Sequence, residues 1–76
     1  MTVYRARGKI GRLRTRIFEM EEGRDMKKLA ILLRLSLSQV YRIKHGQRPI
    51  GEKFIVGALI AFPKYKFEDL FYVEEV

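Results

Sequence analysis

Apolar residues recur along much of this chain at spacings of three and four, which places them on one face of a helix. The first such stripe is formed by Ile10, Leu13, Ile17 and Met20. It predicts a helix over residues 10–22. Gly23 would end this helix in the left-handed conformation that commonly follows a last turn.

Two shorter helices are predicted next. Asp25 is a typical N-cap for the first, which runs around buried leucines to about residue 34. Ser36 is an N-cap for the second, and Gln39 three residues later completes a Ser-x-x-Gln capping box. We expect the second helix to end near His45. Only about three residues therefore join the two helices.

The last third of the chain predicts a fourth helix and a final short one. The fourth covers residues 52–62 and is stopped by Pro63, and the last covers residues 68–72. The chain ends, residues 2–5 and 72–76, tolerate β structure and could pair as a two-stranded ribbon. The expected fold class is all-α, a compact domain of four to five helices.

Positive charge is concentrated at the start of the chain. Residues 1–18 carry six basic side chains and no acidic one, whereas residues 67–76 carry four acidic side chains and no basic one. The whole chain has a formal net charge of +7. Such a basic end suggests a polyanionic partner, with a solvated tail as the alternative. We therefore treat residues 1–9 as a basic arm or short strand and residues 10–76 as one domain.

Composition narrows the classes of function. The 76 residues include no cysteine and one histidine, too few ligands for a typical zinc site. Nothing in the sequence places a nucleophile, acid and base in a recognisable arrangement, so we expect neither an enzyme nor a cofactor. The longest apolar run, residues 54–62, is less than half of the about 20 residues that a membrane span needs. We expect a cytoplasmic protein with no membrane association and no small-molecule ligand.

The two short helices predict a helix-turn-helix. A connection of about three residues makes the helices cross steeply, which requires a small residue such as Ala30 in the first. Leu35, Val40 and Ile43 are the expected inward anchors. The second helix of such a motif typically projects into the DNA major groove.

These residues resemble the Cro and phage-repressor helix-turn-helix domains, the XRE or lambda repressor-like group. Over about residues 10–71 the shared features are Gly23, Leu29-Ala30, Leu35-Ser36, Val40, Arg42-Ile43, Gly46-x-Arg48-Pro49 and Asp69-Leu70-Phe71. Arg34 departs from the family at a turn position that is often glycine, and Met26 departs where many members carry a polar phosphate-contacting residue. The resemblance implies a lambda repressor-like fold and a homodimer, formed through the C-terminal half, on a two-fold symmetric operator.

The exposed face of the second helix, residues 37–45, supplies the candidate base readers. They are Leu37, Ser38, Gln39, Tyr41 and Arg42. Arginine can bind guanine through two hydrogen bonds, glutamine can do so with adenine, and leucine can touch a thymine methyl group. Gln39 is either a reader or a partner in the capping box. The alternative for the whole face is an ordinary solvated helix surface.

A second group of residues is expected to contact DNA phosphates. Its members are Arg5, Arg7, Lys9, Lys27, Lys28, Lys44, His45 and Arg48. For His45, phosphate contact or helix capping is favoured over catalysis because no partner for a general base is suggested nearby.

The resulting hypothesis is a sequence-specific regulator of transcription that binds double-stranded DNA, acts as a repressor and associates with the nucleoid. The alternative is a protein-interaction module, antitoxin-like or a partner subunit, in which DNA binding is secondary. The apolar run 54–62 motivates this alternative, because a second subunit or the terminal segments must cover it. RNA fits a protruding helix less well than the wide major groove of DNA.

Overall fold

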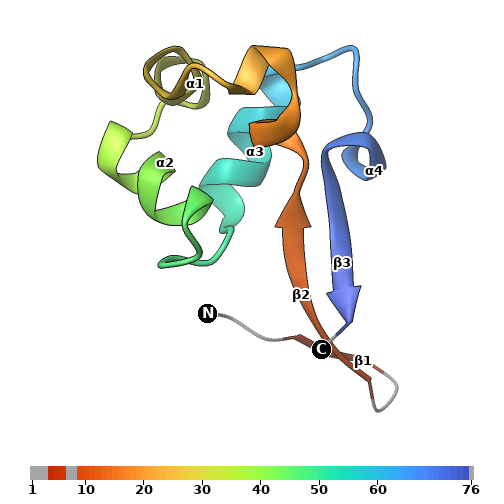
Figure 1. The fold of residues 1–76 in the computed structure, drawn as a ribbon. Coiled ribbons are helices and arrows are strands. Elements are labelled where there is room, and N and C mark those ends of the chain that lie inside the picture. Colours follow the sequence, from red (N-terminus) through yellow and green to blue (C-terminus); the bar gives the residue numbers. More distant parts are fainter. Residues whose placement is uncertain (1–3, 7–8, 76) are drawn as a thin grey trace.

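The computed structural model describes residues 4–6 and 9–75, with side chains described from residue 11 to residue 75 (Figure 1). In chain order the elements are β1 (Tyr4–Ala6), β2 (Lys9–Thr15), the 3-10 helices η1 (Ile17–Glu19) and η2 (Glu21–Gly23), α1 (Met26–Leu33), α2 (Leu37–Lys44), α3 (Glu52–Ala61), α4 (Phe67–Leu70) and β3 (Phe71–Glu75). Figure 1 shows a body of helices from which the sheet extends as an arm.

The expected all-α fold class is wrong, because this is a mixed α and β structure. The predicted helix over residues 10–22 does not form. Its first half belongs to β2, and the rest forms η1 and η2. The apolar residues of this stretch do contact the core, but from other elements. Ile17 lies in η1 and is fully buried, while Leu13 lies in β2 and packs against the core. β2 forms hydrogen bonds with β1 on one edge and β3 on the other, and these bonds outweigh the local helical propensity.

The sheet is antiparallel, with β2 between β1 and β3. Leu13 lies opposite Val73, and Thr15 lies opposite Phe71. The predicted ribbon between the two chain ends is therefore corrected. Both ends form strands, but β1 and β3 each pair with β2 rather than with one another. Residues 2, 3 and 76 of that prediction lie outside the described residues.

A pair of hydrogen bonds fastens the sheet to the helices. The carbonyl of Leu70 accepts from the backbone N–H of Arg16 at 2.8 Å and from the Thr15 hydroxyl at 2.8 Å. These contacts tie the end of β2 to the corner where α4 passes into β3. The predicted last helix is thereby shortened, since residues 71 and 72 are already in β3.

The helix boundaries near the centre of the chain follow the predicted caps. An Asp25 carboxylate oxygen accepts from the N–H groups of Lys27 and Lys28, at 3.1 and 3.2 Å. Ser36 and Gln39 form the reciprocal capping box, with both hydrogen bonds at 3.2 Å. The predicted left-handed Gly23 is wrong, because among the described residues only Arg34 and Gly46 have positive φ.

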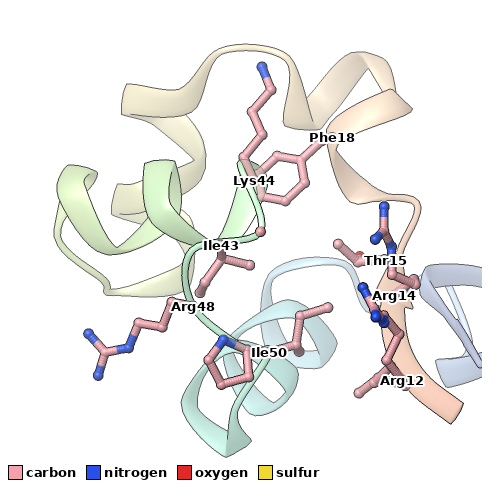
Figure 2. A pocket seen from close by; sticks show the side chains of 11 residues that line it. Arg12, Arg14, Thr15, Phe18, Ile43, Lys44, Arg48 and Ile50 are labelled. Atoms are coloured by element: carbon pink, nitrogen blue, oxygen red, sulfur yellow. The ribbon is translucent and has the colours of Figure 1, made fainter. Parts of the chain in front are cut away.

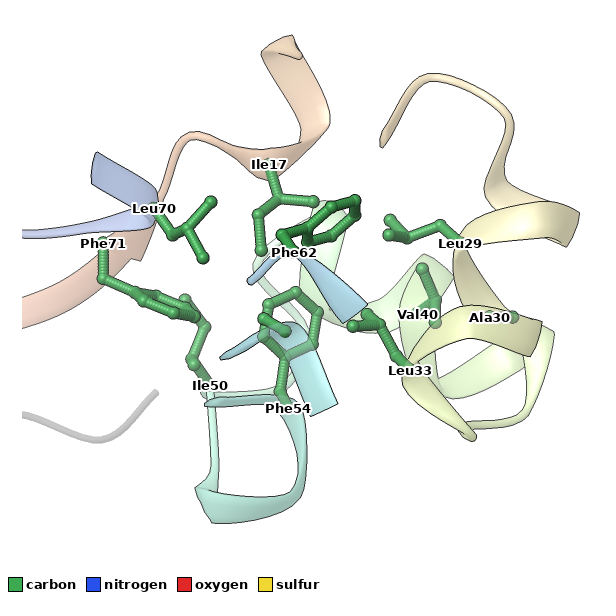
Figure 3. Close-up of a cluster of buried hydrophobic side chains, with 11 residues drawn as sticks. Ile17, Leu29, Ala30, Leu33, Val40, Ile50, Phe54, Phe62, Leu70 and Phe71 are labelled. Atoms are coloured by element: carbon green, nitrogen blue, oxygen red, sulfur yellow. The ribbon is translucent and has the colours of Figure 1, made fainter. Parts of the chain in front are cut away.

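One apolar core joins the helical body to the base of the sheet (Figure 3). Its largest fully buried side chains are Ile17, Leu29, Val40, Phe54, Leu70 and Phe71. The Phe54 and Phe71 rings meet edge to face, with centroids 6.1 Å apart. α1 and α3 cross at Gly57, where a Cβ atom would lie 2.8 Å from the Leu33 carbonyl oxygen. This close approach, predicted from Gly57, is confirmed.

Candidate nucleic-acid interface

α1 and α2 form the predicted helix-turn-helix. Arg34 turns the chain in the left-handed conformation (φ 56°), which explains why glycine would also suit this position. The N–H of Leu35 donates to the Ala30 carbonyl at 3.0 Å and closes the turn. Ala30 and Val40 are buried where the helices meet. Ala30 and Val40 are thus buried as predicted, whereas the other expected anchors, Leu35 and Ile43, are only partly buried and pack against the core.

The opposite side of α2 is open to solvent. Val40 is fully buried, whereas Leu37 is 43% exposed and Tyr41 is 51% exposed. Ser38 and Arg42 are also exposed. A helix that buries one apolar stripe exposes the side chains of its opposite face to solvent. These four residues line a single shallow depression.

Two details of this depression differ from the sequence analysis. Gln39 does not line it, because its amide oxygen accepts from the Ser36 N–H in the capping box. Gln47 does line it, since its N–H donates to the Arg42 carbonyl at 2.8 Å and holds the loop beside α2. Gln47 follows the helix, so the helical pattern does not place it on this face. The one signal in the sequence is Gly46, which adopts the left-handed conformation (φ 71°) where the chain turns back toward α2.

The end of α2 carries an aromatic contact. The rings of Tyr41 and His45 lie 4.2 Å apart between centroids, one helical turn from each other. This contact restricts the Tyr41 ring at the edge of the depression. His45 is exposed at the end of the helix, next to Lys44.

The predicted phosphate-contacting residues lie in different places. Lys27 and Lys28 are exposed in the first turn of α1. The Lys44 ammonium nitrogen lies 3.9 Å from the sulfur of Met26. Of the remaining predicted residues, His45 and Arg48 are exposed at the end of α2 and in the loop after it, and the others belong to the first nine residues. Arg5 lies in β1 and Lys9 lies in β2, but the structure does not describe their side chains. Arg7 lies outside the described residues.

A second concavity lies between β2 and the loop that follows α2 (Figure 2). It encloses about 80 Å³. Four cationic residues line it: Arg12, Arg14, Lys44 and Arg48. Its wall is otherwise largely apolar, with Phe18, Ile43 and Ile50. Sequence reasoning missed Arg12 and Arg14 as site residues because the non-local pairing of β2 brings them here.

Within the described part of the chain, no three His, Cys, Asp or Glu residues gather into a group that could hold a metal ion. None of the described helices is long and apolar enough to cross a membrane. Comparisons of the chain with protein-family models, curated proteins and solved structures found no match. The functional conclusion therefore depends on the geometry of the interface itself.

Proposed function

We propose that this protein is a sequence-specific regulator of transcription that binds double-stranded DNA and acts as a repressor. One observation carries the proposal: Ser38, Tyr41 and Arg42 are exposed together on the face of α2 opposite the fully buried Val40. The major groove of B-DNA is about 12 Å wide and admits one helix. The protein would act in the cytoplasm, at the nucleoid.

The side chains of the depression match the chemistry of base edges. Arg42 can donate two parallel hydrogen bonds to guanine, and Ser38 can donate or accept one. Leu37 offers an apolar contact for a thymine methyl group. Gln47 has both the carbonyl oxygen and the NH₂ group that a bidentate contact with adenine requires. Gln39 retains only its amide NH₂ for this purpose unless the capping box opens.

A homodimer on a two-fold symmetric site completes the proposal. α3 exposes Val56 and Ile60, one turn apart, with exposed fractions of 46% and 74%. Two apolar side chains in this arrangement form a stripe that a second copy can cover. Binding of the dimer over a promoter would exclude the transcription machinery. Sedimentation of the free protein and of its complex with DNA would establish the number of chains.

A selection for bound duplexes from a random pool tests the proposal. We expect enrichment of one motif, with bases in the centre of each half-site set by the depression on α2. The selection is repeated at two salt concentrations, because phosphate contacts alone lose affinity steeply with salt without preferring a sequence. Recovery of the starting pool at both salt concentrations would contradict the proposal.

The exposed apolar residues also favour one alternative, a protein-interaction module with secondary DNA binding. Ile31 on α1 is 77% exposed, and Ile60 on α3 is 74% exposed. Isolated surface apolar residues are common, so this observation is weaker than the face of α2. A stable complex with a co-expressed neighbouring gene product, together with unselective DNA binding, would favour this alternative.

A further inference from the structure

We propose that β2 supplies a second contact with the same duplex, and that the cleft between β2 and the loop after α2 holds a phosphate of the DNA backbone. The proposal rests on the proposed function and adds to it a binding element that is not part of the helix-turn-helix. Arg14 and Arg48 are the main phosphate contacts, with Arg12 beside them.

The side chains of the cleft are arranged along its two edges. Figure 2 shows Arg12 and Arg14 extending from β2, across from Ile43 and Ile50. Arg48 lies on the opposite edge and points outward. Successive residues of a strand alternate between faces, so Arg12 and Arg14 share one face of β2. An anion in the cleft would therefore have the guanidinium groups of Arg12 and Arg14 on the β2 side, while Arg48 would contact the backbone from the outer edge of the loop.

The surroundings of the cleft strengthen attraction for an anion. None of the described residues that line it is acidic. Apolar groups such as Phe18 and Ile50 exclude water from its wall, and charges interact more strongly beside such low-dielectric surfaces. Its volume of about 80 Å³ suits one phosphate group with a little water. Guanidinium groups bind phosphate oxygens through paired hydrogen bonds.

The neighbouring strand determines how the arginines divide this role. Arg12 lies opposite Glu74 in the register of β2 and β3, and Arg12 also interacts within the chain. Arg14 lies opposite Tyr72 and is exposed. Arg16, which follows the end of β2, stacks on Tyr72, with its guanidinium carbon 4.4 Å from the ring centroid. Arg14 is thus the arginine of β2 best placed to bind an external phosphate.

The cleft continues the reading surface of α2. Gln47 lines the depression on α2, and Arg48, the next residue, lines the cleft. Figure 1 shows the sheet and the loop after α2 extending from the same side of the helical body. A duplex seated on α2 would then pass its backbone over this loop toward β2. The hairpin of β1 and β2 would act as a second arm that fixes the orientation of the duplex.

The test is the salt dependence of binding to the selected duplex. A protein that neutralises Z phosphates has a slope of log K against log salt near −0.9Z. We expect the double variant Arg14→Gln, Arg48→Gln, which loses the one phosphate contact of the cleft, to have a slope shallower by about 0.9 and an affinity roughly tenfold lower at low salt. Its preference for the selected motif should be unchanged. The matched control is Lys64→Gln, Lys66→Gln, which removes the same charge from exposed positions between α3 and α4.

The outcomes separate this inference from the proposed function. A motif-selective wild type whose double variant matches the control in slope would overturn the cleft contact and leave the reading helix in place. Loss of preference together with affinity would also overturn it, because phosphate contacts carry no sequence information. A wild type that binds no duplex would contradict the proposed function. Titration with inorganic phosphate tests one more outcome. Amide shifts at the cleft, together with a double variant that binds DNA like the control, would mean that the cleft binds only small anions, which also overturns its assignment to DNA.

Both double variants can be checked for folding without DNA. Arg14, Arg48, Lys64 and Lys66 are all exposed, so thermal unfolding should be nearly the same in both. As a second variant, Arg14→Lys keeps the charge but loses the planar paired donors. It should retain the wild-type slope and bind several-fold more weakly. A slope as shallow as that of the double variant would contradict this role.

Discussion

The helix-turn-helix and the sheet of this protein are held by contacts of very different range. In α1 and α2, the side chains that cap the helices bond to residues two or three positions away. The end of β2 is fixed by the bond from Thr15 to Leu70, 55 positions away. The first region is specified by its own sequence, whereas the second requires the chain ends to meet.

The largest expected effect is at the junction of the two regions. Phe54→Ala removes a ring that is 1% exposed and packs against Phe71 from β3. We expect a loss of about 3–5 kcal/mol in the free energy of unfolding, enough to unfold many domains of this size. Lys53→Ala, the preceding residue on the same helix and exposed, is the control and should cost much less. Similar urea midpoints for the two variants would show that the core does not join sheet and helices.

Gly57→Ala tests the crossing of α1 and α3, with opposite signs expected from helix propensity and from packing. Helix propensity alone predicts a gain of about 1 kcal/mol, because alanine is the better helix former. The added Cβ atom would lie 2.8 Å from the Leu33 carbonyl oxygen, so we expect instead a loss of about 1–3 kcal/mol. Thermal unfolding gives the sign directly. A raised midpoint would contradict the close crossing.

Ser36→Ala tests the local region. It removes the side chain that caps α2 and should cost about 1 kcal/mol in the free energy of unfolding. The Gln39 N–H loses its side-chain acceptor, whereas the bond from the backbone N–H of residue 36 to the Gln39 amide oxygen can remain. Amide exchange should therefore increase mainly in the first turn of α2. Uniformly faster exchange along the chain would show that this cap stabilises the whole domain and not only the first turn of α2.

Thr15→Val tests the corresponding long-range contact and should cost at least as much. The Leu70 carbonyl keeps the Arg16 N–H as a donor, but the N–H of the buried Ile17 loses the Thr15 hydroxyl, which accepts from it at 3.2 Å. We expect a loss of about 1–2 kcal/mol, concentrated in faster exchange of β2 and β3. A loss clearly smaller than that of Ser36→Ala would contradict this role of the Thr15 hydroxyl.

The smallest expected effect is on DNA binding by the sheet. Glu74 lies opposite Arg12, and its carboxylate repels phosphate near the cleft. Glu74→Gln should raise the affinity for the selected duplex about twofold to threefold at low salt, since one exposed charge contributes under 1 kcal/mol. Glu68→Gln on α4 is the control of equal charge and should change the affinity less.

The predictability of this structure follows the range of its contacts. The N-termini of α1 and α2 are capped by side chains within four residues of sequence: Asp25, Ser36 and Gln39. The packed side of the motif is marked by Ala30 and Val40. The exposed face of α2 could therefore be placed from sequence. The strand β2 could not, because its apolar spacing also fits a helix and its partners stand elsewhere in the chain. Arg12 and Arg14 were missed as site residues for the same reason.

The most direct test of the account is the specificity of Arg42→Ala. Affinities of wild type and variant are compared on the selected duplex and on a scrambled one at a single salt concentration. We expect the variant to lose about fivefold to 150-fold on the selected duplex, the effect of one bidentate base contact, and much less on the scrambled duplex. Equal losses on both duplexes, or none on either, would contradict the claim that α2 reads DNA sequence.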